Sequence, residues 1–158
     1  MAHSDALMVA LAPILRQLAS CDPSQPDLAH QLDQQFPLDG EILTVVRKLL
    51  ENGLSEGWLC PRGEPGMSYG RLSKVSPDSH GFSIDAVHMN QPGPGHHHPM
   101  GEIDLCFALS GTPRFDGRKP GWTCYPPGSW HIPTVTDGEM LILYFLPDGA
   151  IRFGPRDA

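Results

Sequence analysis

Apolar residues in the first sixty positions recur at intervals of three and four, which is the period of one buried helical face. A first helix, predicted over roughly residues 5–19, has an apolar face formed by Leu7, Leu11, Ile14 and Leu18. A shorter second helix is indicated by Leu28, Leu32 and Phe36. We expect Asp39 to cap a third helix that ends at Gly53 and has an apolar face of Ile42, Leu43, Val46, Leu49 and Leu50. Each face needs another part of the structure to cover it.

Near Cys60 and Pro61 the helical period gives way to short apolar runs between Gly and Pro. Residues 61–158 contain 14 of the 17 Gly and 13 of the 17 Pro. The runs predict strands over roughly 68–76, 81–90, 94–98, 102–110, 120–126, 130–136 and 139–146. Many short strands with frequent turns are typical of a β-sandwich or barrel. We therefore expect a helical segment over 1–60 that packs on a mainly β domain over 61–158, or on a partner subunit.

The strand predicted at residues 102–110 indicates which face of this domain carries chemistry. Its alternation places Ile103, Leu105, Phe107 and Leu109 on one face. The opposite face has Glu102, Asp104, Cys106 and Ala108. The apolar face suits packing on the helices or on a second subunit, whereas two carboxylates and a thiol are typical of a polar pocket lining.

Charge and composition exclude several classes of partner. The chain has 18 Asp and Glu against 11 Lys and Arg, a net charge of −7, and no Lys/Arg run, so nucleic acids and anionic membranes are poor partners. No apolar run approaches the ~20 residues that a membrane span needs. Residues 18–21 resemble a lipoprotein cleavage site, but Arg16 and Gln17 interrupt the apolar run before it. The four cysteines form no C-x-x-C pair, which favours reduced thiols and a cytoplasmic location.

Residues 96–102 contain the pattern H-x-H-x3-E. On an extended strand His96 and His98 project to one face and His97 points away, while Glu102 can reach the same point after the bend at Pro99 and Gly101. Imidazole and carboxylate ligands suit one divalent ion, with Fe(II) or Mn(II) favoured and Zn(II) or Ni(II) as alternatives. The competing interpretation is that residues 96–98 form a solvated polar loop or bind nickel only adventitiously.

His131 is the predicted fourth ligand. If residues 102–131 fold back as a pair of strands, the turn falls within 111–117 and His131 returns beside Glu102. Three imidazoles and one carboxylate in an octahedral shell leave two positions for water or substrate, which is typical of a catalytic metal site.

These residues resemble the two cupin motifs. His96, His98 and Glu102 match the ligands of the first motif. The second motif is matched by Gly121, Pro126, Gly128 and His131. The glycine that closes the first motif comes late, at Gly111, and Val135 stands where the second motif often ends in Asn. The resemblance implies a small antiparallel β-barrel, or jelly roll, with the metal inside, over about residues 68–147.

A longer pattern is similar to the 4-hydroxylaminobenzoate lyase family over nearly the whole chain. It consists of the helical segment, GHHHPMGEIDLCFALSGTPRFDGRKPGW at 95–122 and YPPGSWHIPTVTDGEMLILYFLPDGAI at 125–151. This resemblance implies conversion of 4-hydroxylaminobenzoate and water to 3,4-dihydroxybenzoate and ammonia, a step in nitroaromatic degradation. Such a reaction breaks the N–O bond, adds water to the neighbouring ring carbon and hydrolyses an imine, so it needs an electrophile and proton transfer.

Candidate catalytic residues follow from the predicted strand faces. Asp104 shares the face of Glu102 and is the first candidate acid or base, with a buried structural role as its alternative. His88 and Tyr144 are weaker candidates. The carboxylate of a small aromatic substrate suits an arginine, and Arg71, on the same strand face as Tyr69, is the candidate.

Three other basic residues of the β domain are expected to lie far from the metal. Arg114, Arg118 and Lys119 belong to the predicted hairpin tip, up to ~30–40 Å from Glu102 along an extended strand.

Two alternatives to the lyase use the same ligands: an Fe(II) ring-cleaving dioxygenase, and a small-molecule-binding cupin without catalysis. Oxygen consumption distinguishes the first from a lyase. Apolar strand faces and the helices at one end favour a homodimer.

Overall fold

The computed structural model describes residues 2–157, with the side chains of residues 5–157. Three helices come first, as the apolar periods predict: α1 (Ala2–Leu18), α2 (Leu28–Gln35) and α3 (Glu41–Glu56). The strands that follow in the described part of the chain are β1 (Arg62–Glu64), β2 (Met67–Ser73), β3 (Phe82–Met89), β4 (His96–His98), β5 (Glu102–Phe115), β6 (Gly121–Tyr125), β7 (Ser129–His131), β8 (Val135–Pro147) and β9 (Arg152–Phe153). Among the helices so described, none is long and apolar enough to cross a membrane.

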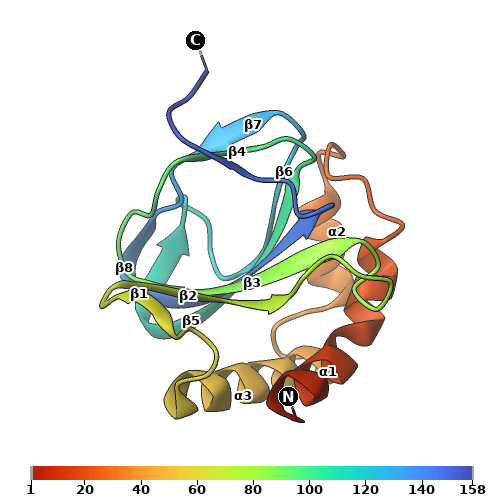
Figure 1. The fold of residues 1–158 in the computed structure, drawn as a ribbon, viewed down its shortest axis with the longest axis vertical. Coiled ribbons are helices and arrows are strands. Elements are labelled where there is room, and N and C mark those ends of the chain that lie inside the picture. Colours follow the sequence, from red (N-terminus) through yellow and green to blue (C-terminus); the bar gives the residue numbers. More distant parts are fainter. Residues whose placement is uncertain (1, 158) are drawn as a thin grey trace.

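The strands form two antiparallel sheets that face each other (Figure 1). The large sheet has the order β1-β2-β3-β8-β5-β6, and the small sheet has the order β7-β4-β9. The helices cover the large sheet on the side away from the small sheet. The prediction of a mainly β, jelly-roll fold with an N-terminal helical segment is confirmed, and the barrel consists of two facing sheets.

Each face of the large sheet has its own apolar cluster, because alternate residues point to opposite sides. Ile103, Leu105 and Phe107 of β5 pack with the buried faces of the helices. Cys106 of the same strand packs between the two sheets, with Ile142 and Tyr144 of β8. The predicted alternation of residues 102–110 is therefore confirmed, and its mixed face lines the interior.

The ends of α3 differ from the prediction. The N-cap is Gly40 rather than Asp39, and it makes no side-chain capping hydrogen bond. The helix continues through Gly53 and ends at Gly57, whose φ of 87° is the left-handed conformation that favours glycine. A Cβ atom at position 53 would lie 2.7 Å from the ring of Trp58, so the glycine inside the helix makes room for this ring rather than ending the helix.

The hairpin after Glu102 also differs from the prediction. β5 continues to Phe115, with register shifts around residues 108–110 and 111–114, and the turn is made by Asp116 and Gly117. Both have positive φ, 51° and 81°, as a two-residue type I′ turn requires. Glu102 pairs with Tyr125 rather than with His131. The prediction took the whole segment 111–117 as the tip and missed the bulges that let β5 continue through it.

Candidate metal centre

Four side chains converge between the two sheets: His96, His98, Glu102 and His131. The first two come from β4, and His131 lies opposite His96 on β7, so the three imidazoles belong to neighbouring strands of the small sheet. Glu102 begins β5 of the large sheet and faces them. One ligand atom from each residue lies within 4.8 Å of the others. His131 thus reaches Glu102 from the opposite sheet, although the predicted strand pairing was wrong.

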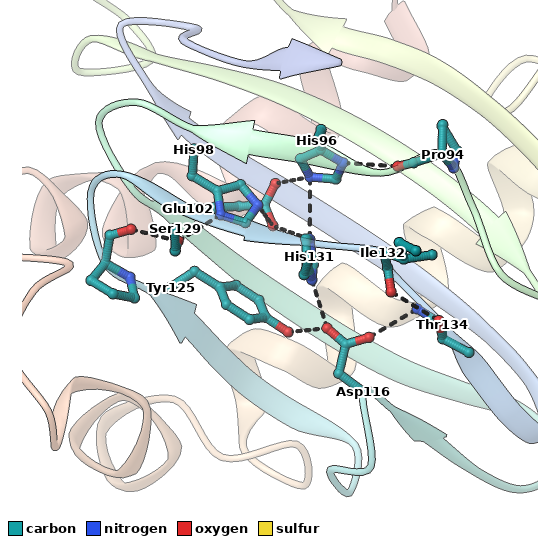
Figure 2. A network of polar contacts seen from close by, with 11 residues as sticks. Pro94, His96, His98, Glu102, Asp116, Tyr125, Ser129, His131, Ile132 and Thr134 are labelled. Atoms are coloured by element: carbon teal, nitrogen blue, oxygen red, sulfur yellow. Dashed lines mark hydrogen bonds and ion pairs between the residues drawn. The ribbon is translucent and has the colours of Figure 1, made fainter. Parts of the chain in front are cut away.

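The ring orientations of His96 and His131 are set by acceptors on the side away from the cluster (Figure 2). His96 Nδ1 donates to the carbonyl oxygen of Pro94 at 3.1 Å, and His131 Nδ1 donates to Asp116 Oδ2 at 2.6 Å. Because each Nδ1 faces an acceptor outside the cluster, Nε2 is the ring nitrogen that can offer a lone pair inside it, where the two Nε2 atoms are 3.2 Å apart.

His98 is oriented in the same way by Ser129. The Ser129 hydroxyl donates to the carbonyl oxygen of Pro126 at 2.6 Å, so it accepts from His98 Nδ1 at 2.9 Å. The free Nε2 of His98 then lies 3.2 Å from Glu102 Oε2. All three imidazoles therefore present Nε2 to one carboxylate.

The electrostatics of the cluster follow from burial beside opposite charge. Burial alone would raise the pKa of the fully buried Glu102, but its polar contacts with the imidazoles of His131, His96 and His98 hold it well below its usual range. Burial lowers the pKa of His98. Burial also acts to lower the pKa of His131, yet hydrogen bonds to Asp116 and Glu102 raise it to about 9.

The donor set fits a divalent metal ion. Metal–ligand distances of about 2.0–2.2 Å place neighbouring ligand atoms about 3 Å apart, and four pairs of Nε2 and Oε atoms in the cluster are 3.2–3.5 Å apart. Two of them, His98 Nε2 and Glu102 Oε2, are buried without a well-formed hydrogen bond within the described residues. A metal ion would satisfy both atoms.

Asp116 and Tyr125 join this centre although sequence reasoning did not select them. The Asp116 carboxylate accepts from His131 Nδ1, from the Tyr125 hydroxyl and from the Thr134 N–H. The predicted hairpin tip thus folds back onto the metal site, and Arg118 lies with its guanidinium carbon 5.5 Å from the Tyr125 ring centre. The expected separation of ~30–40 Å was wrong, because it treated a bulged, curved strand as straight.

A row of buried polar groups lies beside the cluster on the inner face of the large sheet. Asp104 stands opposite Thr123 on β6 and opposite Tyr144 on β8. The side-chain oxygens of all three are buried and, among the described residues, form no well-formed hydrogen bond. Burial raises the pKa of Asp104 well above its usual range, and the charge of Glu102 is the second cause of this increase. Asp104 and Tyr144, both predicted from the sequence, are thus beside the cluster, and Thr123 was missed.

A cavity of about 1000 Å³ lies beside this centre. Of the four cluster residues, His96 lines it, together with Tyr144, and Tyr69 and Arg71 of β2 form part of its wall. Arg71 is already paired with Asp85, through Nε–Oδ1 and Nη2–Oδ2 distances of 2.9 and 3.3 Å. The structure therefore brings Tyr69 and Arg71 to the same cavity as the cluster, with the Arg71 charge partly neutralised.

Two other histidines lie away from the cluster. His88 is on the face of β3 that carries the helix-packed residues Ile84 and Ala86, and its Nε2 lies 2.8 Å from Glu139 Oε2. The prediction of His88 as an acid or base is wrong, because the strand alternation turns it away from the interior. His97 also points away, as expected, and its Nε2 accepts the backbone N–H of Asp157.

A jelly roll with three imidazoles and one carboxylate gathered between its sheets is the architecture of a cupin. Residues 10–153 match the family described as PnbB, 4-hydroxylaminobenzoate lyase. The chain belongs to this family.

Two curated relatives bear the name 4-hydroxylaminobenzoate lyase. The protein from Nocardioides sp. (strain LMS-CY) is 29% identical over 157 residues, which cover 93% of this chain and 92% of that protein. The protein from Pseudomonas putida is 29% identical over 145 residues, which cover 80% and 82%.

Solved structures agree with the fold at lower identity. The crystal structures of the DMSP lyases RdDddP and RnDddQII include a match with a TM-score of 0.54 at 13% identity, covering 98% of each chain. DMSP lyase DddQ from Ruegeria pomeroyi DSS-3 matches with a TM-score of 0.50 at 16% identity, and this match also covers 98% of each chain. At these identities the structural similarity shows the fold alone.

Proposed function

We propose that this protein is a metal-dependent lyase that converts 4-hydroxylaminobenzoate and water to 3,4-dihydroxybenzoate and ammonia. The observation that carries the proposal is a buried three-histidine, one-glutamate cluster, one of whose histidines, His96, lines a cavity large enough for a single aromatic ring. Membership of the family named for this activity supports the choice of substrate.

The reaction balances without an external oxidant or reductant. Cleavage of the N–O bond releases one water, and a second water adds to the ring carbon next to the C–N carbon. A third water hydrolyses the resulting imine, and ammonia leaves. The ring loses the two electrons that nitrogen gains, so the net change is the consumption of one water.

His96, His98, Glu102 and His131 would hold the metal ion, with Fe(II) or Mn(II) favoured and Zn(II) or Ni(II) as alternatives. When bound, such an ion supplies Lewis-acid chemistry for N–O cleavage and for activation of water.

Asp104 is the proposed acid and base. Its carboxyl is buried on the same strand face as Glu102, and among the described residues its two oxygens form no well-formed hydrogen bond. It would protonate the departing hydroxyl and later accept a proton from the attacking water. Tyr144 connects Asp104 to the cavity, since it is the cross-strand partner of Asp104 and also lines the cavity. Its hydroxyl would orient the hydroxylamine group between them.

The outer part of the cavity suits the carboxylate of the substrate. Arg62, Arg71 and Lys74 line it together with one acid, Asp85, an excess of two positive charges in a chain of net charge −7. Arg71 is proposed to bind the carboxylate while Asp85 holds its guanidinium in place. Tyr69, on the same strand, would pack against the aromatic ring. This places the anionic end of the substrate outward and the hydroxylamine end inward.

The test is an anaerobic assay of protein purified without a His tag and loaded with Mn(II) or Fe(II). We expect equal amounts of ammonia and 3,4-dihydroxybenzoate, loss of both in His98→Ala, and normal rates in the control His30→Ala, which changes a histidine of α2. No product above the His98→Ala level would refute the lyase. Turnover that requires and consumes oxygen would support the dioxygenase instead. The homodimer and the cytoplasmic location stay predictions, to be checked by light scattering and by cell fractionation.

A further inference from the structure

We infer that Asp116, supported by Tyr125, is a positioning residue of the metal centre that fixes the ring of His131. The inference rests on the metal site of the proposed function and adds two residues that act through a ligand rather than on the substrate.

Three hydrogen-bond donors converge on the Asp116 carboxylate. His131 Nδ1 lies 2.6 Å from Oδ2, the Tyr125 hydroxyl donates to the same oxygen, and the Thr134 N–H donates to Oδ1 at 2.9 Å (Figure 2). Both oxygens are thus used, and all three donors come from segments around the cluster. A carboxylate satisfies three donors at once because it has acceptor sites only.

The acceptor for His131 differs in kind from those of the other two imidazoles. His96 donates to a backbone carbonyl and His98 to a serine hydroxyl, whereas His131 donates to a carboxylate. A charged acceptor makes a stronger hydrogen bond and increases the basicity of the opposite ring nitrogen, so Nε2 of His131 becomes a stronger metal ligand.

Tyr125 connects this hydrogen bond to the rest of the cluster. Its ring is stacked on His98, with centroids 5.2 Å apart at 30°, and lies 4.4 Å from the ring of His131. It is also the cross-strand partner of Glu102. The tyrosine therefore contacts two ligands with its ring while its hydroxyl holds Asp116.

The matched pair of variants is Asp116→Asn and Asp137→Asn. Both aspartates have left-handed φ, 51° and 62°, which asparagine tolerates equally well. The two substitutions therefore require the same backbone conformation from the new residue. An asparagine at 116 would direct an NH2 group at one of the three converging donors. Asp137 is exposed, lies near the start of β8, and accepts none of these three hydrogen bonds.

The measurement is Co(II) binding to metal-free protein, by competition with a chelator and by visible absorption. We expect Asp116→Asn to bind Co(II) about 10–100-fold more weakly, with a changed absorption spectrum, and Asp137→Asn to match the wild type. Tyr125→Phe, which removes one donor, should weaken binding in the same direction by a smaller factor.

An unchanged affinity and spectrum in Asp116→Asn would overturn the inference, even if its melting temperature fell, since the turn would then matter only for folding. Should that variant fail to fold, Tyr125→Phe decides, and unchanged Co(II) binding there overturns it. A wild-type protein that takes up no Co(II) would instead remove the metal site of the proposed function, and the inference with it.

Discussion

Replacing Leu105 by alanine tests whether the helices and the large sheet share one core. Leu105 is fully buried on β5, faces the helices, and pairs across the sheet with Trp122 and Leu143. Its neighbour Asp104 faces the opposite side, toward the metal centre. The substitution therefore weakens the layer behind the site without touching a ligand.

The expected loss of stability follows from the burial. A fully buried Leu→Ala substitution costs about 2–5 kcal/mol, which combines lost transfer free energy with the cavity left behind. For a chain of this size each kcal/mol lowers the melting temperature by about 2–4 °C, so we expect a decrease of about 4–20 °C. The control is Leu109→Ala on the same strand face, where the side chain is only partly buried and the loss should be clearly smaller.

Thermal unfolding followed by far-UV circular dichroism reports the helices, and tryptophan fluorescence reports in part on Trp122 in the sheet core. With a single core, both signals should move together in Leu105→Ala, and Co(II) affinity of the folded variant should stay within about twofold of the wild type, because independent sites couple weakly. A helical signal that melts separately, or equal losses in the two variants, would contradict a core shared by helices and sheet.

Three further predictions address the cavity, the start of β6 and a thiol. Arg71→Ala should raise the KM for 4-hydroxylaminobenzoate about tenfold or more with little change in kcat, because it removes a charged hydrogen bond to the substrate; an unchanged KM in anaerobic steady-state kinetics would remove Arg71 from the site. Gly121→Ala should lower the free energy of unfolding by about 1–3 kcal/mol, since φ is 123° and the new Cβ would lie 2.7 Å from Asp33 Oδ1; urea denaturation that shows no loss would be the contrary result. Burial raises the pKa of the Cys60 thiol to about 12, so little thiolate exists at pH 8 and iodoacetamide should label it slowly, at a rate that increases with pH. Mass spectrometry showing labelling as fast as that of a free cysteine would contradict this.

Local patterns in the sequence predicted much of this molecule. The helical period of Leu7 to Leu18, the alternation of β5 and the H-x-H-x3-E pattern each depend on a few neighbouring backbone angles. His96, His98 and Glu102 lie within seven residues, so the chain has little freedom in bringing them together. Their convergence was predicted correctly for this reason.

The tertiary structure alone decided which distant residues complete the centre. Asp116 reaches His131 because bulges curve β5 and carry its turn back over the cluster, and His131 arrives from the small sheet rather than beside Glu102. Likewise, Asp85 restrains Arg71 through a contact between strands. A hydrophobic period of two or 3.6 residues specifies the direction of a side chain within one strand or helix. The position of the far end of a long strand, in contrast, depends on the combined effect of many small twists and bulges. Those depend on packing between the two sheets, which no single segment of the sequence contains.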